Sequence, residues 1–190
     1  MIGAIVLAAG SSSRMGRAKA HLPAGPNGRS FVDTITGTLA AAGVSTVRVV
    51  VAPGLTQPPR HAVVNPDPSA GMLSSVLCGL RAFGEELDAV LVWPVDHPLV
   101  ERDTVVAMIA ALKSTGVPIV VPTHGGKRGH PVLFAERVFP ELLAADASAG
   151  ARSVVHAHDD RLELPVTDPG VVADIDTPED YARVFGAVAP

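Results

Sequence analysis

The feature that most constrains the fold is a set of short, nearly continuous apolar runs, in which apolar residues occupy both faces. They cover residues 2–8 (IGAIVLA), 46–52 (TVRVVVA) and 89–95 (AVLVWPV). Helical patterns separate them, at residues 31–42, 70–83 and 101–113. Strands that are apolar on both faces are typical of a parallel sheet covered by helices on each side. The pattern therefore predicts an α/β fold in three layers, α/β/α, with a mostly parallel sheet.

The second half of the chain continues the alternation with weaker signals. Further strands are expected at residues 61–64, 118–122 and 161–165, and further helices at 136–145, 151–157 and 178–185. A glycine-rich segment, HGGKRGHPVLF, feeds another strand after residue 124. With 190 residues, no repeat and no long linker, the chain is expected to form one domain over residues 1–190.

Composition excludes several classes of partner. A formal net charge of −4 is unsuited to a general nucleic-acid binder, which needs a basic face. No stretch approaches the roughly 20 apolar residues of a membrane span, and no basic region precedes the first apolar run as in a signal peptide. The expectation is a soluble cytoplasmic protein that binds neither nucleic acid nor membrane.

The loop after the first apolar run is suited to holding an anion. It reads AAGSSSRMGRAK over residues 8–19, so glycine and serine precede Arg14 and Lys19. Ligands of open parallel sheets bind beyond the carboxyl ends of the strands, where this loop lies. Its backbone N–H groups and two cations suit a triphosphate, although the spacing matches neither the phosphate loop of common NTPases nor the dinucleotide fingerprint. The alternative is an ordinary connector with solvated charges.

Two groups of carboxylates could hold a metal ion near that loop. Asp96 ends the third apolar run, and a carboxylate beside a phosphate requires a divalent ion such as Mg²⁺ between them. The alternative is that Asp96 caps the helix that begins near Glu101, five residues later. Asp174 and Asp176 precede the last helix, whose N-cap is Thr177, and one of them could complete a metal site with Asp96.

The segment NPDPSAGMLSSVLCGL, residues 65–80, enters a helix through small residues. Gly71 stands at the helix entry, and Ser74 or Ser75 could form a hydrogen bond with a base or a ribose. A packing face made of small residues is the alternative.

A basic group follows the predicted strand at 118–122. Lys127, Arg128 and His130 lie in the glycine-rich segment and would suit a second anionic substrate. A solvated turn is the alternative.

Read together, these segments resemble a known family. LAAGSSSRMGRAK (7–19), NPDPSAGMLSSVLCGL, PVDHPLV, GKRGHPVLF and DIDTPEDY are similar, in this order, to the motifs of nucleotidyltransferases that act on the molybdenum cofactor. The cytidylyltransferase branch is most similar, because Ala9 stands where guanylyltransferases usually have a second glycine. The resemblance implies a Rossmann-like nucleotidyltransferase domain. It implies transfer of NMP, with CTP as the expected donor, to the phosphate of molybdopterin.

The resemblance also implies roles for individual residues. The nucleotide would be bound by Leu7, Ala8, Ala9, Gly10, Ser12, Arg14, Lys19, Gly71 and Ser75. Arg14, Lys19 and Asp96 would act in catalysis, Asp96 and Asp176 would hold Mg²⁺, and Lys127, Arg128 and His130 would bind the acceptor. A molybdoenzyme or its chaperone is a further candidate partner. Alternatives are a guanylyltransferase, a transferase with another phosphorylated acceptor, and a nucleotide-binding protein that delivers a cofactor without chemistry.

Overall fold

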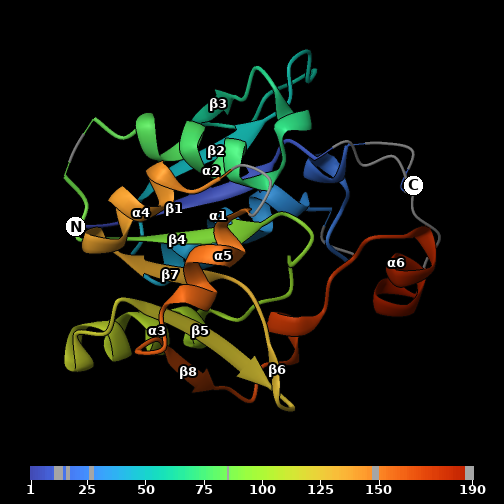
Figure 1. Ribbon diagram of the computed structural model, residues 1–190. Helices are drawn as coiled ribbons and strands as arrows, with labels where there is room; N and C mark the ends of the chain where they lie inside the picture. Colours follow the sequence, from blue (N-terminus) through green and yellow to red (C-terminus); the bar gives the residue numbers. More distant parts are fainter. Residues whose placement is uncertain (11–14, 16–17, 26–27, 85, 147–149, 187–190) are drawn as a thin grey trace.

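The structure, a computed structural model, describes residues 1–10, 15, 18–25, 28–84, 86–146 and 150–186 (Figure 1). The strands are β1 Ile2–Ala8, β2 Thr46–Val51, β3 Ala62–Val64, β4 Ala89–Pro94, β5 Ile119–His124, β6 Lys127–Arg128, β7 Val132–Ala135 and β8 Leu162–Pro165. The α-helices are α1 Phe31–Ala41, α2 Met72–Arg81, α3 Arg102–Thr115, α4 Phe139–Ala144, α5 Gly150–Ala157 and α6 Pro178–Phe185. Short 3₁₀ turns are η1 Lys19–His21, η2 Pro68–Ala70, η3 Glu136–Val138 and η4 Pro169–Val172.

All of these strands belong to one mixed sheet with the order β3-β2-β1-β4-β7-β5-β6, in which β8 also pairs with β5. The pairs β3–β2, β2–β1, β1–β4 and β5–β8 are parallel. The pairs β4–β7, β7–β5 and β5–β6 are antiparallel. The α/β fold predicted from the sequence is confirmed, with an antiparallel section inserted between β4 and β8.

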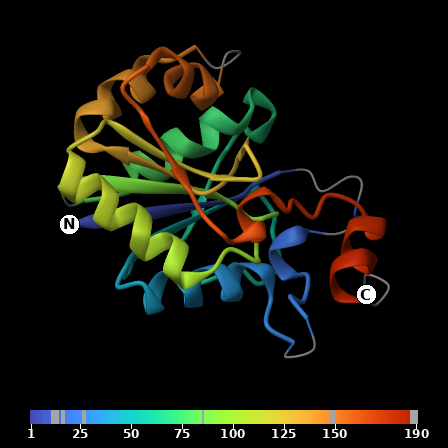
Figure 2. The same cartoon turned by 90° about the horizontal axis from the view of Figure 1, so that it is seen from below.

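Helices cover both faces of this sheet (Figure 2). Helices α1 and α3 bury their apolar residues against one face, and α2, α4 and α5 pack on the other. Alternate residues of β1 serve the two cores, since Val6 belongs to the first and Ile5 to the second, both fully buried. This double burial is the physical reason for the nearly continuous apolar runs.

The predicted elements are found in order, with one clear correction. The helix expected over residues 70–83 begins only at Met72, after the separate turn η2. Gly71, with φ +93° and ψ 175°, lies between them and cannot continue a helix. The strand β6 was not predicted, because two exposed basic residues carry no apolar pattern. In the described part of the chain no helix is both long and apolar enough to cross a membrane.

The C-terminal helix α6 lies beside η1, away from the N-terminus (Figure 1). The Tyr181 hydroxyl donates to the carbonyl of Pro23 at 2.9 Å, and the Tyr181 ring stacks on Phe31 at a centroid distance of 6.4 Å. These contacts fix helix α6 next to the segment that follows the first loop.

Candidate active site

A pocket of about 280 Å³ opens at the carboxyl ends of β1 and β4. The candidate nucleotide-binding and metal-binding residues that the structure describes all line it: Leu7, Ala8, Ala9, Gly10, Lys19, Gly71, Ser75, Asp96 and Asp176. Ser12 and Arg14, which were predicted to hold the triphosphate, lie outside the described residues. The structure thus brings together residues from four separate segments of the sequence.

The register of the central strands explains why the first loop and the Asp96 loop meet at the pocket. In the parallel pair β1–β4, Leu7 lies opposite Pro94, and the Val95 N–H donates to the Leu7 carbonyl at 3.0 Å. The first loop and the loop that carries Asp96 therefore leave the sheet side by side. Parallel strands produce this result because their carboxyl ends share one edge.

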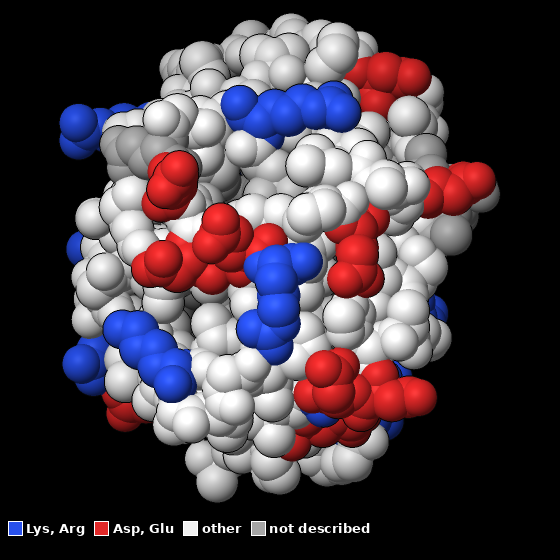
Figure 3. Space-filling model, turned by 60° about the vertical axis from the view of Figure 1, so that its left-hand side comes forward, with Lys and Arg blue, Asp and Glu red and all other residues white. Residues whose placement is uncertain are grey.

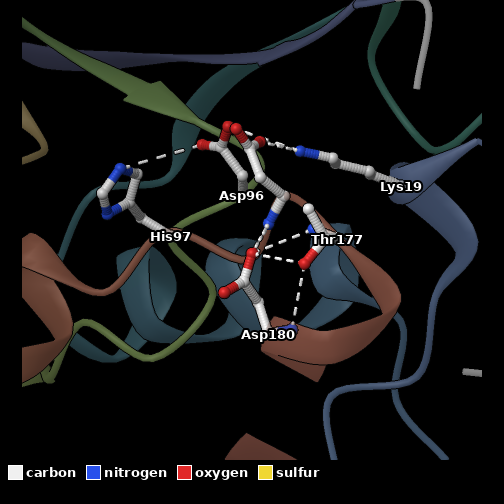
Figure 4. Close-up of polar contacts among 6 residues, drawn as sticks. Lys19, Asp96, His97, Thr177 and Asp180 are labelled. Atoms are coloured by element: carbon white, nitrogen blue, oxygen red, sulfur yellow. Dashed lines mark hydrogen bonds and ion pairs between the residues drawn. The ribbon is translucent and has the colours of Figure 1, made fainter. Parts of the chain in front are cut away.

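Lys19 forms the charged centre of the pocket (Figure 4). Its ammonium group contacts Asp176 Oδ1 and lies 3.7 Å from Asp96 Oδ2, while only 11% of its side chain is exposed. The two carboxylates are 80 residues apart in sequence and meet around one cation. Such a partly buried carboxylate pair requires a positive charge between its members.

Asp176 reaches this position through a backbone bond and a capping box. The N–H of Ile175 donates to the Asp96 carbonyl at 2.9 Å, which ties the C-terminal segment to the β4 loop. The Asp180 carboxylate accepts from the backbone N–H of Thr177 at 3.0 Å and from its hydroxyl, and these bonds lower the pKa of Asp180 (Figure 4). Asp174 is exposed, so the structure distinguishes the two candidates and directs Asp176 to the pocket.

Asp96 has capacity for a further ligand. Its Oδ1 atom is buried and has no hydrogen-bond partner among the described residues. The nearest ring nitrogen, His97 Nε2, lies 3.8 Å away, which is too long for a hydrogen bond. Two carboxylates with an unused oxygen fit a hard divalent cation. The described residues contain no cluster of three or more His, Cys, Asp or Glu side chains suited to a metal, so phosphate oxygens and water would complete its coordination.

His97 is a buried residue next to Asp96 that the sequence analysis missed. Its carbonyl accepts from Trp93 Nε1 at 3.0 Å, and its ring, in a residue only 8% exposed, packs 4.9 Å from the ring of His130. Burial, and then the neighbouring His97, lowers the pKa of His130 to about 4, so His130 is neutral at pH 7. The sequence signal that could have identified His97 was its position directly after Asp96.

The other two candidate acceptor residues lie elsewhere on the surface. Lys127 and Arg128 form β6, which follows a turn at Gly125 and Gly126, and both side chains are exposed. Arg128 Nη2 pairs with Glu163 Oε1 at 2.6 Å, and hydrogen bonds from Arg128 lower the pKa of Glu163. His130 packs inward beside His97, whereas Arg128 extends over β8.

Asp168 takes the capping role that was considered for Asp96. It is 3% exposed and accepts from the Glu101 N–H, the Thr104 hydroxyl and the Gly170 N–H, each at 2.8 Å. It therefore secures the start of α3 from 67 residues away in sequence. Asp96 lines the pocket instead of capping α3.

Charges of both signs share one face of the molecule. On the face shown in Figure 3, Lys and Arg side chains are interspersed with Asp and Glu. This mixture differs from the continuous basic face of a nucleic-acid binder.

Comparison with known proteins identifies the family. Residues 4–162 match the MobA-like NTP transferase domain. The chain belongs to the MobA-like NTP transferase family. It is a nucleotidyltransferase, and its pocket lies where the first loop and the β4 loop meet. Asp176 lies beyond the matched range and joins the pocket through the bond between Ile175 and Asp96.

Relatives with two different base preferences cover nearly the whole chain. A probable molybdenum cofactor guanylyltransferase of Mycobacterium avium is 29% identical over 99% of this chain and 97% of its own length. The molybdenum cofactor cytidylyltransferase of Escherichia coli is 25% identical, over 95% of this chain and 93% of its own. Among the relatives that match this chain, guanylyltransferases are more frequent than cytidylyltransferases.

Solved structures share the fold. Rv0371c from Mycobacterium tuberculosis superposes with a TM-score of 0.79 at 23% identity, covering 98% of this chain and 97% of that one. The same protein has been crystallised in complex with manganese.

Proposed function

We propose that this nucleotidyltransferase transfers CMP from CTP to the terminal phosphate of the molybdenum cofactor, with release of pyrophosphate. The observation that carries the proposal is the pocket at the ends of β1 and β4, where backbone from the first loop faces a Lys19 ammonium held by two carboxylates. The names of the M. avium and E. coli relatives support the acceptor.

The reaction forms one bond and breaks one. A phosphate oxygen of the acceptor attacks the α-phosphorus of the NTP, and the bond from that phosphorus to the bridging oxygen of pyrophosphate breaks. A phosphate dianion needs no base to remove a proton, so the protein's contribution is positioning and neutralisation of charge. Lys19 supplies a fixed positive charge for the phosphates.

Asp96 and Asp176 would hold a divalent cation, Mg²⁺ or Mn²⁺, through their carboxylate oxygens. When bound, such an ion neutralises phosphate charge. The unused Oδ1 of Asp96 supports this assignment. His97 packs behind that oxygen and limits the access of water to it.

The acceptor is proposed to approach from the side of His130, Lys127 and Arg128. His130 is neutral at pH 7, so it would contribute a hydrogen bond and a packing surface to the acceptor. Lys127 and Arg128 would contribute positive charge at longer range from β6.

The preference for CTP is proposed from Ala9. Its side chain is 3% exposed and belongs to the pocket wall. A methyl group there leaves less space than the glycine usual in guanylyltransferases and favours the smaller base. The frequency of guanylyltransferases among the relatives makes GTP the second candidate.

Isothermal titration with CTP and GTP, each with and without Mg²⁺, tests the proposal in wild-type protein and Ala9→Gly. We expect metal-dependent binding that is tightest for CTP, and a smaller ratio of CTP to GTP affinity in Ala9→Gly. Pyrophosphate release with molybdopterin as acceptor then measures turnover. A wild-type preference for GTP would assign the second candidate, and nucleotide binding without pyrophosphate release would favour a carrier without chemistry.

A further inference from the structure

Asn65, at the end of β3, has an amide whose orientation is dictated by its surroundings. The residue is 1% exposed, and the Asp67 backbone N–H donates to its Oδ1 at 3.0 Å. A backbone N–H can only donate, so the atom facing it must be the amide oxygen. The NH₂ group therefore points the other way, toward α2.

This NH₂ group donates to two adjacent serine hydroxyls, Ser74 Oγ at 2.8 Å and Ser75 Oγ at 3.0 Å. The Ser74 hydroxyl donates its own hydrogen bond to the backbone, with the Gly71 carbonyl as acceptor at 2.7 Å. Ser75 differs, because no described residue accepts its proton. Ser75 is 5% exposed and lines the nucleotide pocket.

A serine hydroxyl has one proton to donate, and it cannot be directed at a group that is itself a donor. Asn65 therefore occupies a lone pair of Ser75 and leaves the proton for the pocket. A buried hydroxyl that lacks an acceptor costs free energy unless a ligand or water supplies one.

The position of Ser75 indicates which part of a nucleotide would supply this acceptor. In the sheet order, Asn65 follows β3 at one edge, while Asp96 follows β4, with β2 and β1 between them. The pocket wall beside Ser75 is formed by Pro68 and Met72, which are apolar and uncharged. The nucleoside fits this end, and the phosphates fit the end with Lys19 and Asp96.

We propose that Asn65 is a specificity-determining positioning residue: it fixes the Ser75 hydroxyl as a donor that reads an acceptor atom of the bound nucleoside. The acceptor is a base carbonyl oxygen, a base ring nitrogen or the oxygen of a ribose hydroxyl. The inference rests on the proposed function, since it presupposes that this pocket binds an NTP.

The proposal makes Asn65→Asp a change of polarity at constant shape. A carboxylate oxygen in place of the NH₂ group would accept the Ser75 proton and turn the serine lone pairs toward the pocket. Ser75→Ala removes the donor outright. Ser74→Ala is the matched control, because the Ser74 hydroxyl also bonds to Asn65 but donates to backbone.

The experiment is isothermal titration of CTP with Mg²⁺ into wild type, the three single variants and the Asn65→Asp, Ser75→Ala double variant. We expect Ser75→Ala to weaken CTP binding about fivefold to tenfold, the effect of one neutral hydrogen bond. Asn65→Asp should weaken it at least as much, and the double variant no more than Ser75→Ala alone. Ser74→Ala should bind CTP as wild type does, even where its melting temperature falls.

Analogues distinguish the two sources of the acceptor. If it is a ribose oxygen, Ser75→Ala should bind 2′-deoxy-CTP or 3′-deoxy-CTP as well as wild type does. If it is an atom of the base, the penalty of Ser75→Ala should persist with both analogues. Either result supports a hydrogen bond from Ser75 to the nucleoside and assigns the accepting atom to the ribose or to the base.

The outcomes separate this inference from the proposed function. Tight CTP binding by wild type together with unchanged binding by Ser75→Ala would overturn the inference alone. Absence of binding of any NTP to wild type would overturn the proposed function and this inference with it. If Asn65→Asp fails to fold, the contrast between Ser75→Ala and Ser74→Ala still decides the matter.

Discussion

The two halves of the sheet contribute to the pocket in different ways. In the parallel half, β3-β2-β1-β4, strand ends deliver residues directly: Ala8 ends β1, Ala9 follows it, and Asp96 follows β4. In the other half, β7 and β6 run antiparallel to β5, while β5 and β8 keep the direction of β1 and β4, and no described strand of this half contributes a residue to the pocket. That half delivers Asp176 through the segment after η4, which returns to the β4 loop.

The difference shows where the site depends on local sequence and where it depends on long-range attachment. Residues of the parallel half are positioned by the strand that precedes them. Asp176 and His130 are positioned by bonds to other segments, such as Ile175 N–H to the Asp96 carbonyl and His130 N–H to the Val171 carbonyl at 2.8 Å. Substitutions in the two halves should therefore fail in different ways.

The largest expected effect tests whether both halves serve one reaction. Asp96→Asn and Asp176→Asn should each lower kcat by about a thousandfold, roughly 4 kcal/mol in activation free energy, because each removes half of the proposed cation site. Asp174→Asn, an exposed neighbour, is the control and should retain wild-type turnover. Near-normal kcat for Asp176→Asn beside an inactive Asp96→Asn would confine the chemistry to the parallel half.

The next largest effect concerns Asp168, which attaches the start of α3 to the segment around η4. Asp168→Ala should lower the free energy of unfolding by about 3 kcal/mol, because it leaves the donors of Glu101, Thr104 and Gly170 without their buried acceptor. Urea unfolding measures the loss, with exposed Asp159→Ala as control. Hydrogen exchange should show the lost protection at the start of α3 and around η4. Uniform loss that includes β1 and β2 would contradict a separate attachment.

A pH dependence should distinguish His130 as a packed neutral residue from His130 as a surface cation. Its pKa is about 4 in the folded protein and 6.5 in the unfolded chain, so the unfolded state takes up the proton first as pH falls. Stability should fall by about 2 kcal/mol between pH 7 and pH 5, and less in His130→Asn. Urea unfolding of both proteins at the two pH values checks this. Equal losses would mean that His130 is not the group responsible.

The smallest effect concerns Lys19, whose ammonium group lies between Asp96 and Asp176. Lys19→Met removes a positive charge that competes with a divalent ion for Asp96 and Asp176, so the nucleotide-free protein should bind Mn²⁺ about tenfold more tightly. CTP should bind more weakly, since Lys19 also faces the phosphates. Electron paramagnetic resonance of free Mn²⁺ measures the first effect, with Lys113→Met, exposed on α3, as control. Weaker Mn²⁺ binding by Lys19→Met would remove Lys19 from the carboxylate pair.

Much of the fold and half of the site could be predicted from the sequence. The apolar runs of β1, β2 and β4 report burial on both faces, and that burial is a local property of side chains repeated over six or seven residues. Because parallel strands share a carboxyl edge, the same runs placed the first loop and Asp96 together. The departure at Gly71 was also local, but a glycine within an apolar helical pattern does not reveal its own φ angle.

The sequence by itself determined the class of fold and the pairing of the first loop with Asp96, and it predicts that this loop binds an anion. Tertiary structure alone decided that Asp176, not Asp174, enters the pocket, that Asp168 caps α3, that His97 stacks on His130, and that Asn65 orients Ser75. Local patterns record which residues are buried and which helix or strand they form. They do not record the partners of single polar atoms, because those partners come from segments tens of residues away and meet only when the core has packed.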